Sequence, residues 1–339
     1  MAFDPSAAAR PDSGVFGLSH SEDEARVVLL PVPFEATASY HGGTSRGPEA
    51  ILKASRQVDL FDVETGRPYL SGIHLLPSPR VVADADTRAR DAAGKVHAAG
   101  GAREDRPDLL AAIALVNAAS NEVNRFVEGE VDRLIGAGKK VGVVGGEHAV
   151  SFGSIAAHAR AFPGLGVLHL DAHADLRRAY EGFEHSHASV FYNVMEEQPA
   201  VARLVQVGLR DVCEEEVRYA EASSGRIVPY HDALLASQRF EGETFGSQVR
   251  RIVAELPREV YLSFDIDALE PALCPHTGTP VPGGLTFQQA VGLVRGVVSS
   301  GRRIVGFDLV EVSPGEGPVS IDGDVGARLL YKIIGFMLK

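Results

Sequence analysis

The stretch Leu168-His-Leu-Asp171-Ala-His173-Ala-Asp175 decides the fold that we expect of this chain. The apolar run 167–170 predicts a buried strand, and three potential metal ligands follow it at alternate positions. Side chains alternate between two faces along an extended segment, so Asp171, His173 and Asp175 can project together from the C-terminal end of the strand. Open α/β sheets bind their ligands at that end. Two carboxylates and an imidazole are costly to bury together unless a cation lies between them, so the stretch indicates a metal site rather than a polar loop.

Composition narrows the class of protein. The chain has 339 residues, 45% of them hydrophobic and 23% charged, which is ordinary for a globular α/β protein. A net charge of −12 argues against a nucleic-acid or anionic-membrane partner and favours a small cationic one. Residues 1–21 contain no apolar signal segment, and only two cysteines occur, Cys213 and Cys274. A cytoplasmic protein without a disulfide framework is therefore expected.

Continuous apolar runs alternate with helical patterns along most of the chain, which predicts a parallel sheet covered by helices on both faces. A single domain is expected over residues 25–339, preceded by a loosely held tail at 1–24 and interrupted by an irregular excursion or insertion at 62–106. Long helices are expected at 108–136 and 325–338. The strands are expected at 26–33, 139–144, 166–170, 203–208, 227–230, 260–266 and 303–310.

Two further segments add metal ligands at predicted strand ends. Gly145-Gly146 turns the chain and presents His148, while Asp265 and Asp267 are two positions apart and face one way. The complete set is His148, Asp171, His173, Asp175, Asp265 and Asp267. Six ligands are too many for one structural zinc, which four ligands close, and suit a pair of ions bridged by carboxylates and water. Oxygen-rich ligation favours Mn2+, with Ni2+ or Co2+ as alternatives, and such a pair makes hydroxide available near neutral pH.

Three segments, Gly-Gly-Glu-His148, Asp171-Ala-His-Ala-Asp175 and Ser263-Phe-Asp-Ile-Asp267, resemble the signatures of the ureohydrolase family of arginases and agmatinases. The resemblance extends from residues 43–48 to residues 311–314. It implies a three-layer α/β/α fold of the arginase type, a centre of two manganese ions per chain, and a trimer or hexamer. In the family pattern His148, Asp171, Asp175 and Asp265 hold or share one ion, and His173, Asp171, Asp265 and Asp267 hold or share the other.

The resemblance also assigns catalytic roles. Ser186-His187-Ala-Ser189 is similar to the agmatinase segment whose histidine protonates the leaving amine, so His187 is the expected proton shuttle, with His185 as an alternative. Asp267 is expected to take up a proton on the way. Glu311 ends a predicted strand and is expected to hold the guanidinium with charge-assisted hydrogen bonds.

The substrate is less determined than the chemistry. The loop 176–184 resembles agmatinases more than arginases, and its Glu181 is a candidate contact for a cationic tail. Gly208-Leu-Arg-Asp211 resembles the segment that contacts the substrate amine, although Arg210 and Asp211 could equally pair with other charges. Residues 315–326 depart from the family pattern, which leaves the substrate open.

These observations predict a metal-dependent hydrolase of C–N bonds in linear amidines, with agmatine as the favoured substrate and putrescine and urea as products. Guanidine, guanidinobutyrate, arginine and aminopropylagmatine are alternative substrates, and a formimino hydrolase is an alternative reaction. A mononuclear zinc deacetylase is disfavoured because it would not need six ligands. A metal-binding regulator without catalysis is the alternative from another class of function.

Overall fold

The computed structural model describes residues 4–103, 105–317 and 319–339. Its centre is one eight-stranded sheet in the order β2-β1-β3-β8-β7-β4-β5-β6, and every neighbouring pair is parallel. The strands are β1 (Val27–Val32), β2 (Ile73–Leu75), β3 (Lys140–Gly145), β4 (Leu165–Leu170), β5 (Val201–Leu209), β6 (Ile227–His231), β7 (Glu259–Asp265) and β8 (Arg303–Val310).

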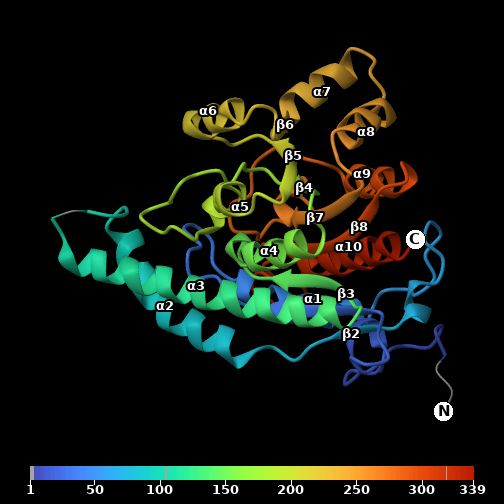
Figure 1. Ribbon diagram of the computed structural model, residues 1–339. Helices are drawn as coiled ribbons and strands as arrows, with labels where there is room; N and C mark the ends of the chain where they lie inside the picture. The colour runs from blue at the N-terminus through green and yellow to red at the C-terminus, as the bar shows by residue number, and fades with distance from the viewer. Residues whose placement is uncertain (1–3, 104, 318) are drawn as a thin grey trace.

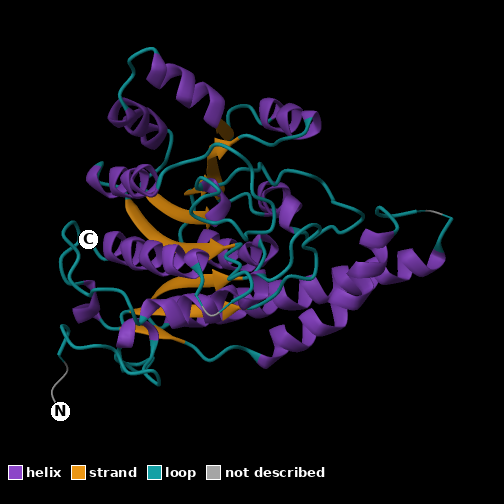
Figure 2. Ribbon diagram, turned by 180° about the vertical axis from the view of Figure 1, so that it is seen from behind, coloured by secondary structure: helices purple, strands orange, loops and turns teal. Residues whose placement is uncertain are grey.

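Helices cover both faces of the sheet, as Figures 1 and 2 show. On one face the helices lie side by side in the order α1, α10, α9 and α8. On the other face they lie side by side in the order α2, α3, α4 and α5. The three-layer α/β/α architecture is therefore confirmed. The α-helices are α1 (Gly47–Ser55), α2 (Arg80–Ala98), α3 (Pro107–Gly136), α4 (Ser151–Ala161), α5 (Val190–Glu197), α6 (Glu214–Ala222), α7 (Asp232–Phe240), α8 (Phe245–Ala254), α9 (Phe287–Ser299) and α10 (Ile321–Met337). No helix among the described residues is long and apolar enough to cross a membrane.

The apolar strand patterns arise from burial on both sides of the sheet. Every residue of β1 and β4 is buried, and β7 and β8 each expose only their first residue to any extent. A strand enclosed by two helical layers has no solvent face, so its sequence does not alternate. The seven predicted strands are all present, and β2, which has only three residues, is the one that the sequence pattern missed.

Residues 62–106 are more regular than expected, because they contain the 19-residue helix α2. Its buried positions include Val82, Ala85, Ala89 and Val96, spaced so that they form one stripe against α3. The expectation of irregular structure was wrong because small alanines, interleaved with Asp and Arg, give a weak apolar signal. Whether this segment is an insertion stays a prediction.

The N-terminal residues also pack more closely than a loosely held tail would. Val15, Phe16 and Leu18 are buried in the core. The Phe16 ring lies 4.8 Å from the ring of Tyr331, centroid to centroid. Its backbone amide donates to the Ser55 hydroxyl at 3.0 Å. Apolar contacts therefore fix residues 15–18. The Ala, Ser and Pro content of residues 1–24 gave no indication of these contacts.

The sheet order determines where polar side chains meet. β3, β8, β7 and β4 are adjacent in the middle of the sheet, although they are far apart in the sequence. Since all strands are parallel, their C-terminal ends lie at one edge. The C-terminal ends of these four strands and the segments that follow them carry the predicted metal ligands and Glu311.

Candidate metal centre

The turn after β3 fixes the position of His148. Gly146 has no room for a side chain, because a Cβ atom there would lie 2.1 Å from the carbonyl oxygen of Phe34. The chain therefore passes close to the loop after β1 and presents a His148 ring that is only 1% exposed. The glycine pair is a steric requirement of the site.

A chain of hydrogen bonds sets the tautomer of His148. Its Nε2 lies 2.9 Å from the hydroxyl of Ser263, and this hydroxyl donates to Asp308 at 2.8 Å. The hydroxyl thus accepts the proton of Nε2, so that Nδ1 is the nitrogen with a free lone pair. Nδ1 is buried and has no hydrogen-bond partner among the described residues. A lone pair without a partner, held among carboxylates, is the arrangement of a metal ligand.

Three carboxylates surround that nitrogen. The distances from His148 Nδ1 are 3.0 Å to Asp171 Oδ2, 3.1 Å to Asp175 Oδ2 and 3.4 Å to Asp265 Oδ2. Asp171 Oδ1 faces the other way, 3.4 Å from His173 Nδ1, and Asp267 Oδ2 lies 3.1 Å from the same nitrogen. The ligands form two groups that share Asp171, as a bridging carboxylate between two ions would require.

Backbone amides hold the carboxylates in these orientations. Asp265 Oδ1 accepts the backbone N–H of Asp267 at 2.8 Å, and Asp267 Oδ1 accepts the N–H of Ala172 at 2.9 Å. In each case the other carboxylate oxygen, Oδ2, points toward the histidine nitrogens of the centre. Asp175 has a φ of +54°, a left-handed conformation that is unusual for a residue with a side chain. Such strain is typical of functional positions.

The crowded carboxylates of the ligand cluster favour the binding of cations. Burial, together with the charge of Asp171, raises the pKa of Asp175 to about 7. Burial, with the neighbouring Asp267 and Asp171, raises the pKa of Asp265 well above its usual value. Burial disfavours the imidazolium of His148, but Asp171, Asp175 and Asp265 outweigh it and raise its pKa well above the usual value. Protons on Asp175, Asp265 and His148 thus offset the crowded negative charge, and a pair of divalent ions would supply the same positive charge. The donor set therefore fits the expected ions.

His169 is a member of the cluster that the sequence did not single out. Its Nε2 lies 2.7 Å from Asp171 Oδ2, and its Nδ1 accepts from the side-chain amide of Gln206 at 2.9 Å. Both ring nitrogens are thus engaged, so His169 supports Asp171 rather than adding a ligand. Its position inside β4, among apolar neighbours, was the available signal, because a fully buried histidine needs partners.

His187 lies in the 3-10 helix that follows the loop after β4. Thr37 holds it: the backbone N–H of His187 donates to Thr37 Oγ1 at 3.2 Å, and the N–H of Thr37 donates to buried Glu147 at 2.9 Å. Burial lowers the pKa of His187 to about 4. His185 instead contacts Phe152 and Asn193.

Glu311 follows β8 directly and has a φ of +62°. Its Oε1 accepts the backbone N–H of His148 at 2.8 Å. Its other oxygen faces Gly278, where a Cβ atom would lie 3.2 Å away. Burial raises the pKa of Glu311 to about 8. The structure thus places Glu311 directly beside the group of ligands around His148.

A cavity of about 240 Å³ opens onto the centre. Its lining comprises Ser39, Tyr40, His173, Asp175, Arg177, Tyr180, His187, Ala188, Asp211, Glu216, Thr279, Pro280 and Val281. His187 therefore faces the cavity, and His185 does not line it.

The two carboxylates expected to contact a substrate tail have different surroundings. The Asp211 side chain is exposed at the cavity and has no hydrogen bond or ion pair among the described residues. Arg210 does not pair with it, since the guanidinium donates to backbone carbonyls, including that of Asp267 at 2.6 Å. Glu181 is not brought to the cavity: its carboxylate contacts the imidazole of His97 on α2.

Comparison with known proteins identifies a family. Residues 25–335 match the family model described as the arginase family. An N1-aminopropylagmatine ureohydrolase of Thermus thermophilus is 36% identical, over 92% of this chain and 90% of that protein. An agmatinase of Cronobacter sakazakii is 30% identical, over 92% and 88%. A guanidinobutyrase of Pseudomonas aeruginosa is also 30% identical, over 92% and 86%.

Solved structures share the fold. An arginase from Medicago truncatula has a TM-score of 0.68 and 25% identity, and the match covers 93% of this chain and 88% of that one. A proclavaminate amidino hydrolase from Streptomyces clavuligerus has a TM-score of 0.75 at 22% identity, over 98% and 99%.

Proposed function

Because this chain belongs to the arginase family and is a hydrolase of C–N bonds in amidines, we propose that it is a binuclear manganese ureohydrolase of a guanidine with a polyamine tail. The preferred substrate in this proposal is N1-aminopropylagmatine. Agmatine, which the sequence analysis favoured, is the next candidate. The products are urea and the corresponding amine.

The sharing of Asp171 between two groups of ligands is the observation that carries the binuclear proposal. When bound, two divalent ions lower the pKa of a water molecule and supply Lewis acidity. The six residues that would hold them are the six that the sequence predicted. Manganese suits their mostly oxygen donors.

The remaining side chains have separate tasks in this proposal. Glu311 aligns the guanidinium carbon, because its Oε1 is fixed by the His148 amide and its position is fixed by the end of β8. His187 moves a proton to the leaving amine from its place in the cavity wall. Asp267, whose Oδ1 is held by the Ala172 amide, takes part in the transfer of the proton from water.

The choice of substrate rests on the outer part of the cavity and on the relatives. The unpaired Asp211 carboxylate suits a distal ammonium group better than a substrate carboxylate. The relatives named as aminopropylagmatine ureohydrolases reach 36% identity over nearly the whole chain, and the agmatinase named above is 30% identical. A tail with an additional aminopropyl group is therefore the first choice.

The test is urea release by the manganese-loaded protein from N1-aminopropylagmatine, agmatine, guanidinobutyrate, arginine and guanidine at equal concentrations. The proposal expects kcat/KM to be highest for N1-aminopropylagmatine and next highest for agmatine. A higher kcat/KM for guanidinobutyrate or arginine would overturn the proposal that the substrate has a polyamine tail. Absence of urea with all five, with Mn2+, Ni2+ or Co2+, would overturn the proposal and leave formamide release from a formimino substrate, or a binding role, to be tested. The expected trimer or hexamer stays a prediction for sedimentation analysis.

A further inference from the structure

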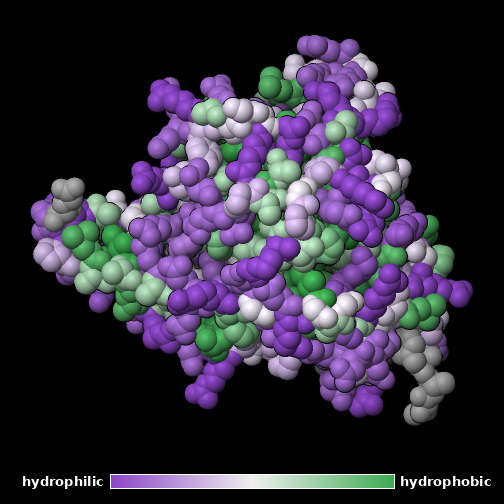
Figure 3. Space-filling model, in the orientation of Figure 1, coloured by the Kyte–Doolittle hydropathy of each residue, from purple (hydrophilic) through white to green (hydrophobic). Residues whose placement is uncertain are grey.

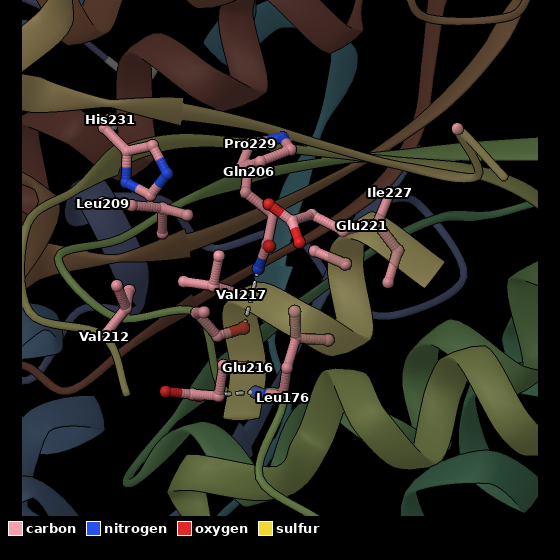
Figure 4. Close-up of a pocket in the computed structure, with 13 residues that line it drawn as sticks. Leu176, Gln206, Leu209, Val212, Glu216, Val217, Glu221, Ile227, Pro229 and His231 are labelled. Carbon is pink, nitrogen blue, oxygen red and sulfur yellow. Dashed lines mark hydrogen bonds between the residues drawn. The ribbon is translucent and has the colours of Figure 1, made fainter. Parts of the chain in front are cut away.

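A second cavity, of about 270 Å³, lies beneath α6 at the β6 edge of the sheet (Figure 4). It is distinct from the cavity of about 240 Å³ that opens onto the metal centre, which is the catalytic cavity of the proposed function. Most of its wall is hydrocarbon. The apolar side chains include Leu176, Leu209, Val212, Val217, Ala220 and Ile227. A cavity of this size and composition can enclose a short alkyl chain.

One polar group in the wall has an unsatisfied hydrogen-bonding capacity. Gln206 on β5 is fully buried, and its Nε2 donates to Ala174 O at 2.7 Å and to His169 Nδ1 at 2.9 Å. Both partners are acceptors, which fixes the orientation of the amide. Its Oε1 is buried and has no partner among the residues that the structure describes. Because buried carbonyl oxygens are rarely left unpaired, a ligand with an N–H group would complete this site.

A carboxylate at the same cavity determines the charge of that ligand. Glu221 lines the cavity from α6, is exposed, and has no hydrogen bond or ion pair among the described residues. Figure 4 shows its side chain extending toward Gln206. The net charge of −12 adds a general attraction for cations.

We propose that this cavity is a second binding site, which takes a short primary alkylammonium ion. An N–H of the ammonium donates to Gln206 Oε1, the Glu221 carboxylate balances its charge, and the hydrocarbon stem packs on Leu176, Val217 and Ile227. The site goes beyond the proposed function, because it neither contains the metal ligands nor needs urea release.

Glu216 separates this site from the catalytic cavity. It lines both cavities, and its carboxylate is fixed by the backbone N–H groups of Leu176 at 3.0 Å and Cys213 at 2.9 Å. The second cavity is thus not an extension of the first. It still bears on the metal centre, because Gln206 holds the His169 ring that contacts Asp171.

The test is calorimetric titration of the manganese-loaded protein with n-pentylamine, using a matched pair of variants on α6. Ala220→Leu fills the cavity, while Ala222→Leu adds the same group on the exposed side of the helix. We expect Ala220→Leu to weaken binding at this site at least ten-fold and Ala222→Leu to leave it unchanged. We expect Glu221→Gln, an exposed change that should not affect folding, to weaken it several-fold. n-Pentanol, which lacks the charge, should bind more weakly than the amine.

Inhibition of urea release reports the catalytic cavity, where an amine can also bind. Pentylamine should inhibit urea release equally in wild type and in Ala220→Leu, because that substitution fills only the second cavity. This comparison distinguishes binding at the two sites. The proposal fails if pentylamine binding is absent, if it is the same in Ala220→Leu and Glu221→Gln as in wild type, or if pentanol binds equally well. A lack of urea release in the substrate panel would refute the proposed function without affecting this titration.

Discussion

The imidazole of His97, on α2, contacts the carboxylate of Glu181 across 84 positions of sequence, in the loop beside the cavity that opens onto the candidate metal centre. The same loop is bound to α3 where the backbone N–H of Glu184 donates to Asn117 at 3.0 Å. Arg177 and Tyr180 of this loop line the cavity. The paired helices α2 and α3 therefore support a wall of the candidate active site.

His97→Ala should loosen that wall. We expect a several-fold higher KM, faster tryptic cleavage after Arg177 or Arg178, and a loss of global stability of about 1 kcal/mol, the net contribution of one side-chain hydrogen bond. Arg88→Ala is the control, since its ion pair with Glu122 joins the same two helices on their exposed side. Equal cleavage rates in the two variants would contradict this role for His97.

Ser263→Ala should weaken metal binding. The hydroxyl fixes the His148 tautomer by accepting from Nε2 and donating to Asp308. Loss of such support costs about ten- to a hundred-fold in metal affinity. Competition with a chelator would measure the dissociation constant for Mn2+. Ser237→Ala, on the exposed side of α7, should leave that constant unchanged. If both variants bind Mn2+ as the wild type does, Ser263 has no positioning role.

Asp171→Asn and Asp267→Asn should differ in metal stoichiometry. Asp171 belongs to both ligand groups, whereas Asp267 belongs to one of them. We expect Asp171→Asn to lose both manganese ions and Asp267→Asn to retain about one per chain, measured by elemental analysis after dialysis. Two ions retained in Asp171→Asn would show that this carboxylate does not bridge.

Asp211→Asn should raise KM for substrates with a cationic tail. The carboxylate is exposed, so the loss corresponds to about 1 kcal/mol, or roughly five-fold, with kcat little changed. Guanidine, which lacks the tail, should be turned over equally by variant and wild type. Asp91→Asn, an exposed change on α2, is the control for net charge. A KM for N1-aminopropylagmatine that stays at the wild-type value would exclude Asp211 from recognition of the tail.

His158 should make the stability depend on pH. Burial lowers the pKa of His158 to about 4, from the ordinary histidine value of about 6.5. Below pH 6.5 the unfolded state binds more protons than the folded state, so this contribution to stability is present at pH 7.5 and is lost as the pH falls. At pH 5 the loss amounts to about 2 kcal/mol.

The measurement is the difference in free energy of unfolding in urea between wild type and His158→Gln, at pH 7.5 and pH 5. Gln retains a donor for the Ser154 carbonyl, which His158 Nδ1 contacts at 2.8 Å, but does not titrate. We expect the advantage of the wild type to fall by about 2 kcal/mol between the two pH values. An advantage that does not change with pH would refute this account.

The sequence by itself determined the layered α/β architecture, because strands enclosed on both faces must be continuously apolar. It also predicted six candidate metal ligands, because alternate positions after a strand and a glycine-limited turn are local properties of the chain, and the structure brings these six side chains close together. His187 was preferred to His185 on the basis of a short motif, and only His187 lines the cavity.

Only the tertiary structure decided which distant residues support these ligands. The contacts of His148 with Ser263, and of His169 with Gln206, depend on the order of the strands in the sheet. The same holds for His97 and Glu181, whose contact depends on the packing of α2. Such partners meet through side-chain packing between segments far apart in sequence, and local periodicity carries no information about which segments become neighbours.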